Sequence, residues 1–207
     1  MMVFEQFRKS YGKTEILGIP HLQLQPGVYW LRGDNGAGKS TLMRSIAGMI
    51  PYEGNITVNE MNIRRNRLAY TSVVNYAEAE PLYPGFLTGS DLVQFYAASK
   101  RAPAGQAQSL CEQMGVHTFM GNRVATYSSG MTKKLSLVLG LIGNPQLVLL
   151  DEPLITLDTT STGILQQIVN EYADRGVSFI ISSHQDMVPG TRPMTQLYIK
   201  NKTIETA

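Results

Sequence analysis

The sequence predicts an α/β fold in which helices cover both faces of a largely parallel β-sheet. Two continuous apolar runs, residues 146–150 and 177–182, have the length and composition of strands that are buried on both faces. A third β-favouring run, residues 27–32, leads directly into a glycine-rich segment and then into apolar residues at helical spacing. Because strands and helices alternate in this way along the chain, we expect the strands to pair in parallel.

Length and composition exclude several classes of protein. The 207 residues correspond to about one domain, and 43% are apolar against 16% charged, which excludes a disordered, solvating chain. The net charge is only +2 and the basic residues are spread thinly, so we expect no nucleic acid partner. The single cysteine, Cys111, excludes an internal disulfide and suits a reducing compartment.

No export signal or membrane-spanning segment is expected. Residues 1–9 include Glu5 and lack the apolar run of a signal peptide. The most apolar stretch, residues 135–150, is too short and too often interrupted by polar residues and proline to cross a bilayer. The sequence therefore predicts a cytoplasmic protein, for which any role at a membrane depends on a partner.

The first third of the chain is expected to be rich in β-structure. Short β-favouring runs recur there, separated by turn-forming residues, and Pro20 breaks one of them. The expected strands are residues 3–8, 16–24, 27–32, 56–58, 61–63 and 68–74.

The middle of the chain changes from β-rich to helical. Pro81 and Pro84 mark a loop, after which Thr88 or Ser90 can cap a helix that runs to about residue 98. A second helix is suggested by apolar residues at helical spacing that follow a proline–glycine break. We therefore expect a helical insert at about 85–128 within a single domain of 1–207, with a core of about 1–84 and 129–207.

The last third returns to alternating helices and strands, and it ends in two short β-runs around Asn201 and Lys202 that suggest a hairpin. The expected helices are residues 128–143 and 159–173, and the expected strands are 146–150, 177–182, 197–200 and 203–205.

A phosphate-binding loop is predicted from the spacing of Gly33, Gly38, Lys39 and Ser40, which form the pattern G-x-x-x-x-G-K-S. Glycines let consecutive backbone N–H groups turn toward a phosphate, and the N-terminus of the following helix adds a favourable dipole. Lys39 would reach the β- and γ-phosphates, and the Ser40 hydroxyl would coordinate Mg²⁺. A chance glycine-rich turn is disfavoured by the strand before it and the helix after it. The predicted binding residues are Gly33, Asp34, Asn35, Gly36, Ala37, Gly38, Lys39, Ser40 and Thr41.

Two acidic residues follow the apolar strand 146–150. The end of that strand would bring Asp151 near the phosphates, where it can hold Mg²⁺ through water. Glu152 is placed to polarise an attacking water. An ordinary acidic turn is the alternative, and the neighbouring phosphate loop argues against it.

These motifs resemble those of the ATP-binding cassette (ABC) ATPases. The chain reads Gly-Asp-Asn-Gly-Ala-Gly-Lys-Ser-Thr-Leu at 33–42 and Leu-Leu-Asp-Glu-Pro at 149–153, close to the usual motifs of that family. The resemblance covers essentially the whole chain. It implies a P-loop NTPase fold, with a RecA-like core, an N-terminal antiparallel β-subdomain and an inserted helical subdomain. It also implies ATP hydrolysis, with ATP and Mg²⁺ bound.

The resemblance implies roles for two segments on either side of the phosphate loop. Tyr11 matches the aromatic residue that stacks on adenine, and a strand-end tyrosine without a ligand is the alternative. Ser128, Ser129 and Gly130 match the signature, usually Leu-Ser-Gly-Gly-Gln, which caps the γ-phosphate of an ATP held by the other subunit. An ordinary helix cap is the alternative there. Ser129 stands where the family has glycine, and its Cβ could hinder the approach of the backbone.

Three further residues take their roles from the resemblance. Asp158 matches the aspartate loop that communicates between subunits, with a solvated helix cap as the alternative. His184, after strand 177–182, matches the switch histidine that contacts the γ-phosphate and the catalytic water, although a lone histidine is more often structural. The count back from residues 82–84 places Glu78 where the family has a Mg²⁺-contacting glutamine. Asn75 and Glu80 stay open for that position, and a solvated acidic loop is the alternative.

The leading functional hypothesis is the ATP-hydrolysing, nucleotide-binding subunit of an ABC transporter. A second nucleotide-binding subunit would complete a head-to-tail dimer, homodimeric or heterodimeric, that sandwiches two ATP molecules. A membrane-spanning subunit would attach it to the cytoplasmic face of the membrane, and the pattern at Glu78 favours export over import. One alternative is a catalytically weak partner subunit, motivated by Ser129, Glu78 and Thr156. A soluble ABC ATPase outside transport is another, and a P-loop kinase would require the signature, Glu152 and His184 to be coincidental.

Overall fold

Two β-sheets form the framework of the chain, of which a computed structural model describes residues 1–183 and 193–206. Neighbours in the larger sheet pair in parallel, except for the antiparallel pair at one edge that forms the predicted terminal hairpin. In spatial order this sheet contains β10 (Thr203–Thr206), β9 (Thr195–Lys200), β3 (Val28–Arg32), β8 (Ser178–Ser182), β7 (Leu147–Asp151) and β6 (Val74–Ala77).

The smaller sheet is antiparallel and is built from the N-terminal part of the chain. Its strands, in spatial order, are β2 (Thr14–Leu24), β1 (Met2–Tyr11), β4 (Glu53–Val58) and β5 (Met61–Asn62). Contrary to the expected break, β2 runs through Pro20 without interruption. This is possible because β2 lies at the edge of its sheet, where a residue without an amide hydrogen is tolerated.

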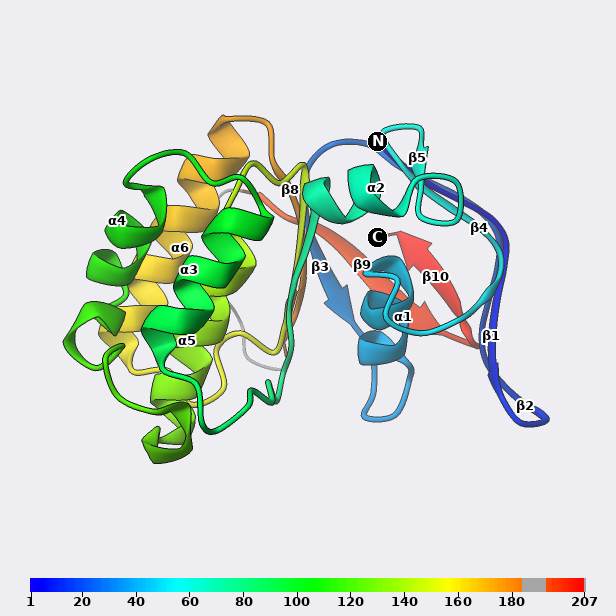
Figure 1. Ribbon diagram of the computed structural model, residues 1–207. Helices are drawn as coiled ribbons and strands as arrows, with labels where there is room; N and C mark the ends of the chain where they lie inside the picture. Colours follow the sequence, from blue (N-terminus) through cyan, green and yellow to red (C-terminus); the bar gives the residue numbers. More distant parts are fainter. Residues whose placement is uncertain (184–192, 207) are drawn as a thin grey trace.

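Helices lie on both sides of the larger sheet (Figure 1). On one side are α3 (Gly89–Ser99), α4 (Gln106–Gln113), α5 (Ser129–Leu141) and α6 (Thr159–Asp174). On the other side, toward the smaller sheet, are α1 (Lys39–Ile46) and α2 (Arg67–Val73). Short 3₁₀ helices occur at Val116–Thr118 and Val124–Thr126. Among the described residues, no helix is both long and apolar enough to cross a membrane.

The larger sheet separates two clusters of buried apolar side chains. Along β7, Val148 and Leu150 belong to the cluster under α3–α6, whereas Leu147 and Leu149 belong to the cluster around α1. Every residue of β7 is buried, which confirms the predicted strand with two covered faces. Cys111 of α4 lies in the first cluster, and burial raises the pKa of its thiol to about 11.

One expected strand is wrong. Residues 68–74 form most of α2 and the first residue of β6, a strand that the sequence did not predict. The run is rich in β-branched and aromatic residues, but Asn66 caps the helix by accepting a hydrogen bond from the Ala69 amide at 3.1 Å. Tyr70 is buried, and its hydroxyl donates to the Ile46 carbonyl at the end of α1 at 2.7 Å. Cap and packing therefore override the local β-propensity.

Hydrogen bonds from side chains stabilise both ends of α3. Thr88 is the N-cap, and it exchanges hydrogen bonds with Asp91 in a capping box. At the other end Lys100 donates to the carbonyls of Thr71 and Val74. A Cβ at Gly143 would lie 2.8 Å from that of Lys100, so glycine is required for this close approach.

Candidate active site

The predicted phosphate loop forms a tight turn between β3 and α1. Gly36 and Gly38 have φ angles of 80° and 107°, in the left-handed region that glycine adopts without strain. A Cβ at Gly38 would lie 3.1 Å from Ile16 and 3.2 Å from Leu17, so the loop packs closely on β2. Helix α1 then begins at Lys39 with no side-chain cap and no acidic residue in its first turn. The loop therefore presents the positive end of a helix dipole, as an anion site requires.

Lys39 folds back over this loop instead of extending into solvent. Its ammonium donates to the carbonyl oxygens of Gly33 at 2.8 Å and of Asp34 at 3.3 Å. The residue is buried, at 8% exposure. A fixed positive charge therefore lies within the loop, where it can attract phosphate oxygens.

A cavity of about 510 Å³ joins the loop to the ends of two strands. From the loop it is lined by residues between Asn35 and Thr41, including Lys39 and Ser40. Glu152, which follows β7, also lines it. The structure thus brings Lys39, Ser40 and Glu152 into one cavity. The lining residues from outside the loop are Ala79, Glu80, Glu152 and Ile155.

Two further cavities border the same loop. One, of about 630 Å³, is lined by Asp34 and Ala37, by Ile16 of β2 and by residues of the β9–β10 hairpin. The other, of about 460 Å³, is lined by Gly33, Asp34 and residues that include Ser183. Together with the first cavity, they leave room for a ligand that extends beyond a phosphate group.

Tyr11 does not line any of these three cavities. It is half exposed at the end of β1, and the Lys9 ammonium lies 4.5 Å from the centroid of its ring. The first residues after Tyr11 in the sequence that line the 630 Å³ cavity are Thr14, Glu15 and Ile16 of β2, and the sequence did not identify them as site residues. No sequence signal marks them, since they belong to an ordinary alternating strand.

Asp151 is held by hydrogen bonds to both of its carboxylate oxygens. Oδ1 accepts from the Ser182 hydroxyl at 2.6 Å, and Oδ2 accepts from the Tyr76 hydroxyl at 3.1 Å. Burial, together with the charges of Asp151 and Glu78, raises the pKa of Tyr76, so its hydroxyl keeps its proton. Each carboxylate oxygen retains a further acceptor site.

Glu152 adopts an uncommon backbone conformation directly after Asp151. Its φ is 46°, a left-handed value that costs free energy for a residue with a side chain. The Glu152 amide donates to the carbonyl and the hydroxyl of Ser182, at 3.1 and 3.0 Å. Ser182 therefore holds both acidic residues. Its place at the end of an apolar strand was the signal that could have identified it.

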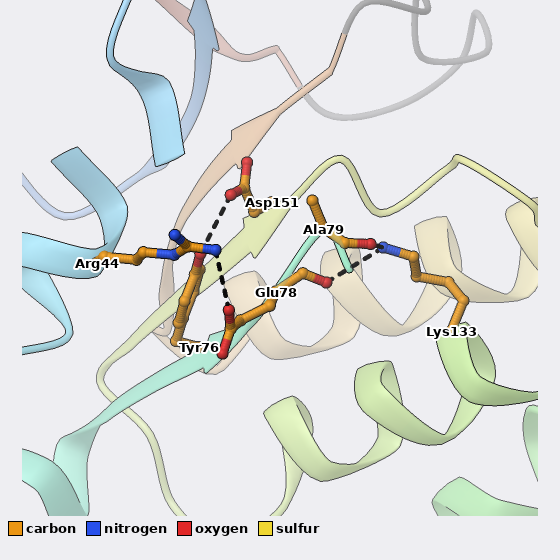
Figure 2. Close-up of polar contacts among 6 residues, drawn as sticks. All are labelled: Arg44, Tyr76, Glu78, Ala79, Lys133 and Asp151. Carbon is orange, nitrogen blue, oxygen red and sulfur yellow. Dashed lines mark hydrogen bonds and ion pairs between the residues drawn. The ribbon is translucent and has the colours of Figure 1, made fainter. Parts of the chain in front are cut away.

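The three candidates for the Mg²⁺-contacting position lie in different surroundings. Glu78 forms an ion pair with Arg44 of α1 at 3.2 Å (Figure 2). Asn75 is buried and donates to the carbonyls of Gly140 and Ile142, at 3.0 and 2.9 Å. Glu80 lines the cavity that contains Lys39, Ser40 and Glu152. The assignment to Glu78 stays a prediction, and the structure shows that its carboxylate already has a partner.

The predicted signature and aspartate loop lie next to each other, outside the 510 Å³ cavity. Ser128 caps α5 by accepting from the Met131 amide at 3.2 Å, and it is exposed together with Ser129. A Cβ at Gly130 would lie 3.1 Å from the Thr156 carbonyl, so these two segments approach closely.

Asp158 is the N-cap of α6, and its carboxylate accepts from the Ser161 amide at 2.7 Å. It also pairs with Lys134 at 2.8 Å. These contacts lower the pKa of Asp158. Both Ser128 and Asp158 are therefore helix caps, whatever further role they have. His184 lies outside the described residues.

The family is decided by comparison with known proteins. A family model described as "ABC transporter" matches residues 19–155. The chain belongs to the ABC transporter family. Membership confirms the resemblance, the P-loop NTPase fold and the class of ATP-hydrolysing enzyme expected from the sequence.

Relatives of this ABC chain include ATP-binding proteins of Streptococcus pyogenes and Bacillus subtilis. It is 30% identical over 187 residues to the lantibiotic transport ATP-binding protein of Streptococcus pyogenes, covering 89% of this chain and 80% of the relative. It is 28% identical over 190 residues to the linearmycin resistance ATP-binding protein of Bacillus subtilis. That alignment covers 89% of this chain but 61% of the relative, so this chain spans less than two thirds of that protein.

Solved structures share the fold of the ABC chain. An ATP-binding subunit of an ABC transporter superimposes with a TM-score of 0.88, at 20% identity, covering 100% of this chain and 89% of the other. A dimeric ATP-binding cassette bound to ADP and phosphate gives 0.84 at 16% identity, covering 99% and 97%. At these identities the likeness concerns the fold alone.

Proposed function

We propose that this ABC family chain binds and hydrolyses ATP in the 510 Å³ cavity, as one half of a head-to-tail dimer that powers export across a membrane. The observation that carries the proposal is the meeting of Lys39, Ser40 and Glu152 in that one cavity. A fixed cation and a helix N-terminus suit the phosphates, and a carboxylate faces the same space. The family of the chain supports the same reaction.

Each residue would contribute a different part of the chemistry. Lys39 would neutralise the β- and γ-phosphates, and the amides of the loop would bind their oxygens. Ser40 and Asp151 would hold Mg²⁺, since a hydroxyl and a carboxylate bound through water suit this cation. When bound, Mg²⁺ supplies neutralisation of the charge that develops on the phosphate oxygens. The donors at Tyr76 and Ser182 fix the Asp151 carboxylate and leave acceptor sites open, so the residues fit that ion.

Glu152 would act as the general base. A water attacks the γ-phosphorus, the bond from phosphorus to the bridging oxygen of ADP breaks, and Glu152 takes the proton of the water. The two hydrogen bonds from its amide to Ser182 hold this residue at the C-terminal end of β7. A buried carboxylate is suited to this task because the surrounding protein excludes competing solvent.

We propose Glu80, in place of Glu78, as the acidic residue of the loop after β6 that acts near the phosphates. Glu80 lines the cavity, whereas the Glu78 carboxylate is paired with Arg44. A carboxylate at this position could contact Mg²⁺ or its waters. Comparison of Glu80→Gln with Glu78→Gln distinguishes the two, since only the variant at the functional position should change the Mg²⁺ requirement.

Two exposed surfaces support the proposed contacts with a second nucleotide-binding subunit and with a membrane-spanning subunit. Ser128 and Ser129 are exposed at the N-terminus of α5, where they could face the ATP of a second subunit. Leu82 and Phe86, which precede α3, and Phe95 on α3 are large exposed apolar residues. A membrane-spanning subunit that covers them would hold the chain at the cytoplasmic face of the membrane. Export is supported by the name of one further relative, a Nod factor export ATP-binding protein of Rhizobium etli, which is 30% identical over 187 residues.

The test is the variant Glu152→Gln, which keeps the shape of the side chain and removes the base. Hydrolysis should fall by about 10²- to 10⁴-fold while Mg-ATP still binds. A closed dimer should then accumulate and elute as a dimer on a sizing column with Mg-ATP. Glu112→Gln, an exposed change on α4, is the matched control and should behave as the parent.

The outcome also separates the alternative functions. A hydrolytically dead variant that stays monomeric at saturating ATP would exclude a sandwich of identical subunits. If it dimerises only with a second, different cassette, the chain is a partner in a heteromeric transporter. Retained hydrolysis would remove Glu152 from the catalytic role.

A further inference from the structure

We propose that Lys133 is a positioning residue that fastens helix α5 to Glu152 and thereby sets the rate of hydrolysis. Lys133 is buried, with an exposure of 3%. Its ammonium donates to three backbone carbonyls: those of Glu78 at 3.2 Å, of Ala79, and of Glu152 at 3.2 Å. This inference rests on the proposed role of Glu152 as general base.

The three bonds use the full donor capacity of the ammonium. An ammonium group has three N–H donors, and here each can meet a different carbonyl. Bonds from a charged donor are stronger than neutral ones, and the buried position protects them from water. Lys133 therefore joins three segments that are far apart in the sequence: α5, the segment after β6 and the turn after β7.

The segment Glu78–Ala79 is held from two sides (Figure 2). From α1 the Arg44 guanidinium pairs with the Glu78 carboxylate, and from α5 the Lys133 ammonium binds the carbonyls of Glu78 and Ala79. Helix α1 begins at the phosphate loop, and α5 begins at the predicted signature. The segment is thus a junction between the two helices that would meet the phosphates from opposite subunits.

The third hydrogen bond of Lys133 is donated to the carbonyl of Glu152, the proposed general base. Glu152 has a left-handed φ of 46°, so its backbone needs restraint from its surroundings. Ser182 restrains the Glu152 amide, and Lys133 restrains the Glu152 carbonyl. Because the Glu152 carbonyl is bonded to Lys133 of α5, a displacement of α5 would change the orientation of the Glu152 backbone and, with it, of the carboxylate.

Lys133 does not line the 510 Å³ cavity, so it would act through Glu152 and not on ATP directly. Loss of its ammonium should therefore lower kcat and leave the binding of ATP nearly unchanged. A misplacement of about 1 Å in a catalytic group can cost on the order of 10²-fold in rate. We expect kcat to fall about 10- to 100-fold in Lys133→Met, with KM for ATP within about twofold.

The neighbouring Lys134 provides a matched control. It lies on the same helix but forms a partly exposed ion pair with Asp158. Lys134→Met should change kcat less than threefold if surface charge on α5 is not what matters. An equal loss of kcat in both variants would overturn the specific role of Lys133.

The decisive measurement combines Lys133→Met with Glu152→Gln in single-turnover hydrolysis. If Lys133 acts through Glu152, the double variant should be no slower than Glu152→Gln alone, because the base it positions is already absent. Additive losses would mean that Lys133 acts elsewhere and would overturn the proposal. Full activity of Glu152→Gln alone would instead contradict the proposed function.

A second variant covers the case in which Lys133→Met does not fold. Lys133→Gln retains two of the three donors without the charge, and we expect a three- to tenfold loss of kcat, on the order of one hydrogen bond. Thermal unfolding of each variant identifies the folded fraction, so that kcat refers to folded protein only. An unchanged kcat in the folded variant would overturn the proposal.

Discussion

The Tyr76 hydroxyl donates a hydrogen bond of 3.1 Å to Oδ2 of Asp151, so a residue of the unpredicted strand β6 orients the acid at the end of β7. We expect Tyr76→Phe to raise the Mg²⁺ concentration for half-maximal ATPase activity about three- to tenfold, the loss of about one hydrogen bond. Titration of activity with Mg²⁺ at saturating ATP measures this shift.

Tyr70→Phe is the control for that experiment. Tyr70 is also a buried tyrosine with a donated hydrogen bond, but its partner is the Ile46 carbonyl. It should lose stability without a change in Mg²⁺ dependence. If both variants shift the Mg²⁺ requirement equally, Tyr76 does not orient Asp151.

Replacement of Ser129 by glycine tests whether its Cβ hinders the approach of a second subunit. Ser129 is exposed at the start of α5, so the change removes no internal packing. Ser129→Gly should raise ATP-dependent dimerisation or turnover, because a bare backbone permits closer contact with a phosphate. Turnover and sizing with Mg-ATP show the effect. An unchanged variant would mean that the native site accommodates serine, and a catalytically weak subunit would lose its main support.

Stacking of adenine on Tyr11 can be tested by truncation of its ring. Tyr11→Ala should weaken ATP binding by about 1–3 kcal/mol, whereas Tyr11→Phe, which keeps the ring, should bind as the parent does. Equilibrium binding of a fluorescent ATP analogue measures both affinities. If neither changes and Ile16→Ala weakens binding, the base lies in the 630 Å³ cavity lined by Ile16 and not on Tyr11.

Stability should depend on pH through Lys100. Burial lowers the pKa of Lys100 from 10.5 to about 8, so the unfolded chain binds more protons between those two values. The free energy of unfolding should therefore rise with pH across this window, and this gain is lost as pH falls toward 8. Partial exposure screens the effect to the order of 1–2 kcal/mol.

Urea unfolding at several pH values between 8 and 10 measures this slope in the parent and in Lys100→Met. The difference in unfolding free energy between the two proteins should grow with pH. A parallel pair of curves for the parent and Lys100→Met would contradict a lowered pKa.

The sheet and most helices could be predicted because their signals are local. Strands β7 and β8 are each marked by a short apolar run. Helix α1 is marked by the spacing of apolar residues directly after the glycine-rich loop. Helix α2 has one local signal, the cap at Asn66, but the residues that follow favour a strand. The helical state of Tyr70 depends on the Ile46 carbonyl, 24 positions away in the sequence, and propensity takes no account of such a partner.

The candidate site was predictable where one motif supplied it, and not where segments meet in space. Lys39 and Ser40 could be predicted from the fixed pattern of the phosphate loop. Glu152 could be predicted from its position directly after an apolar strand. The sequence alone could not distinguish Glu78 from Glu80, because the path of the loop after β6 determines where each side chain lies. Glu78 pairs with Arg44, whereas Glu80, two positions later, lines the cavity. Ser182 and Lys133 act through backbone groups of other segments, which no motif records.

The buried Cys111 makes this chain suitable for site-directed labelling. Reaction with maleimide reagents requires an accessible thiolate. Cys111 is buried, and its pKa of about 11 keeps the thiol protonated at neutral pH, so it should not react. A cysteine introduced at an exposed position such as 129 would therefore be the reactive one without removal of the native residue. Spin labels placed there could report the distance between two subunits during the ATP cycle.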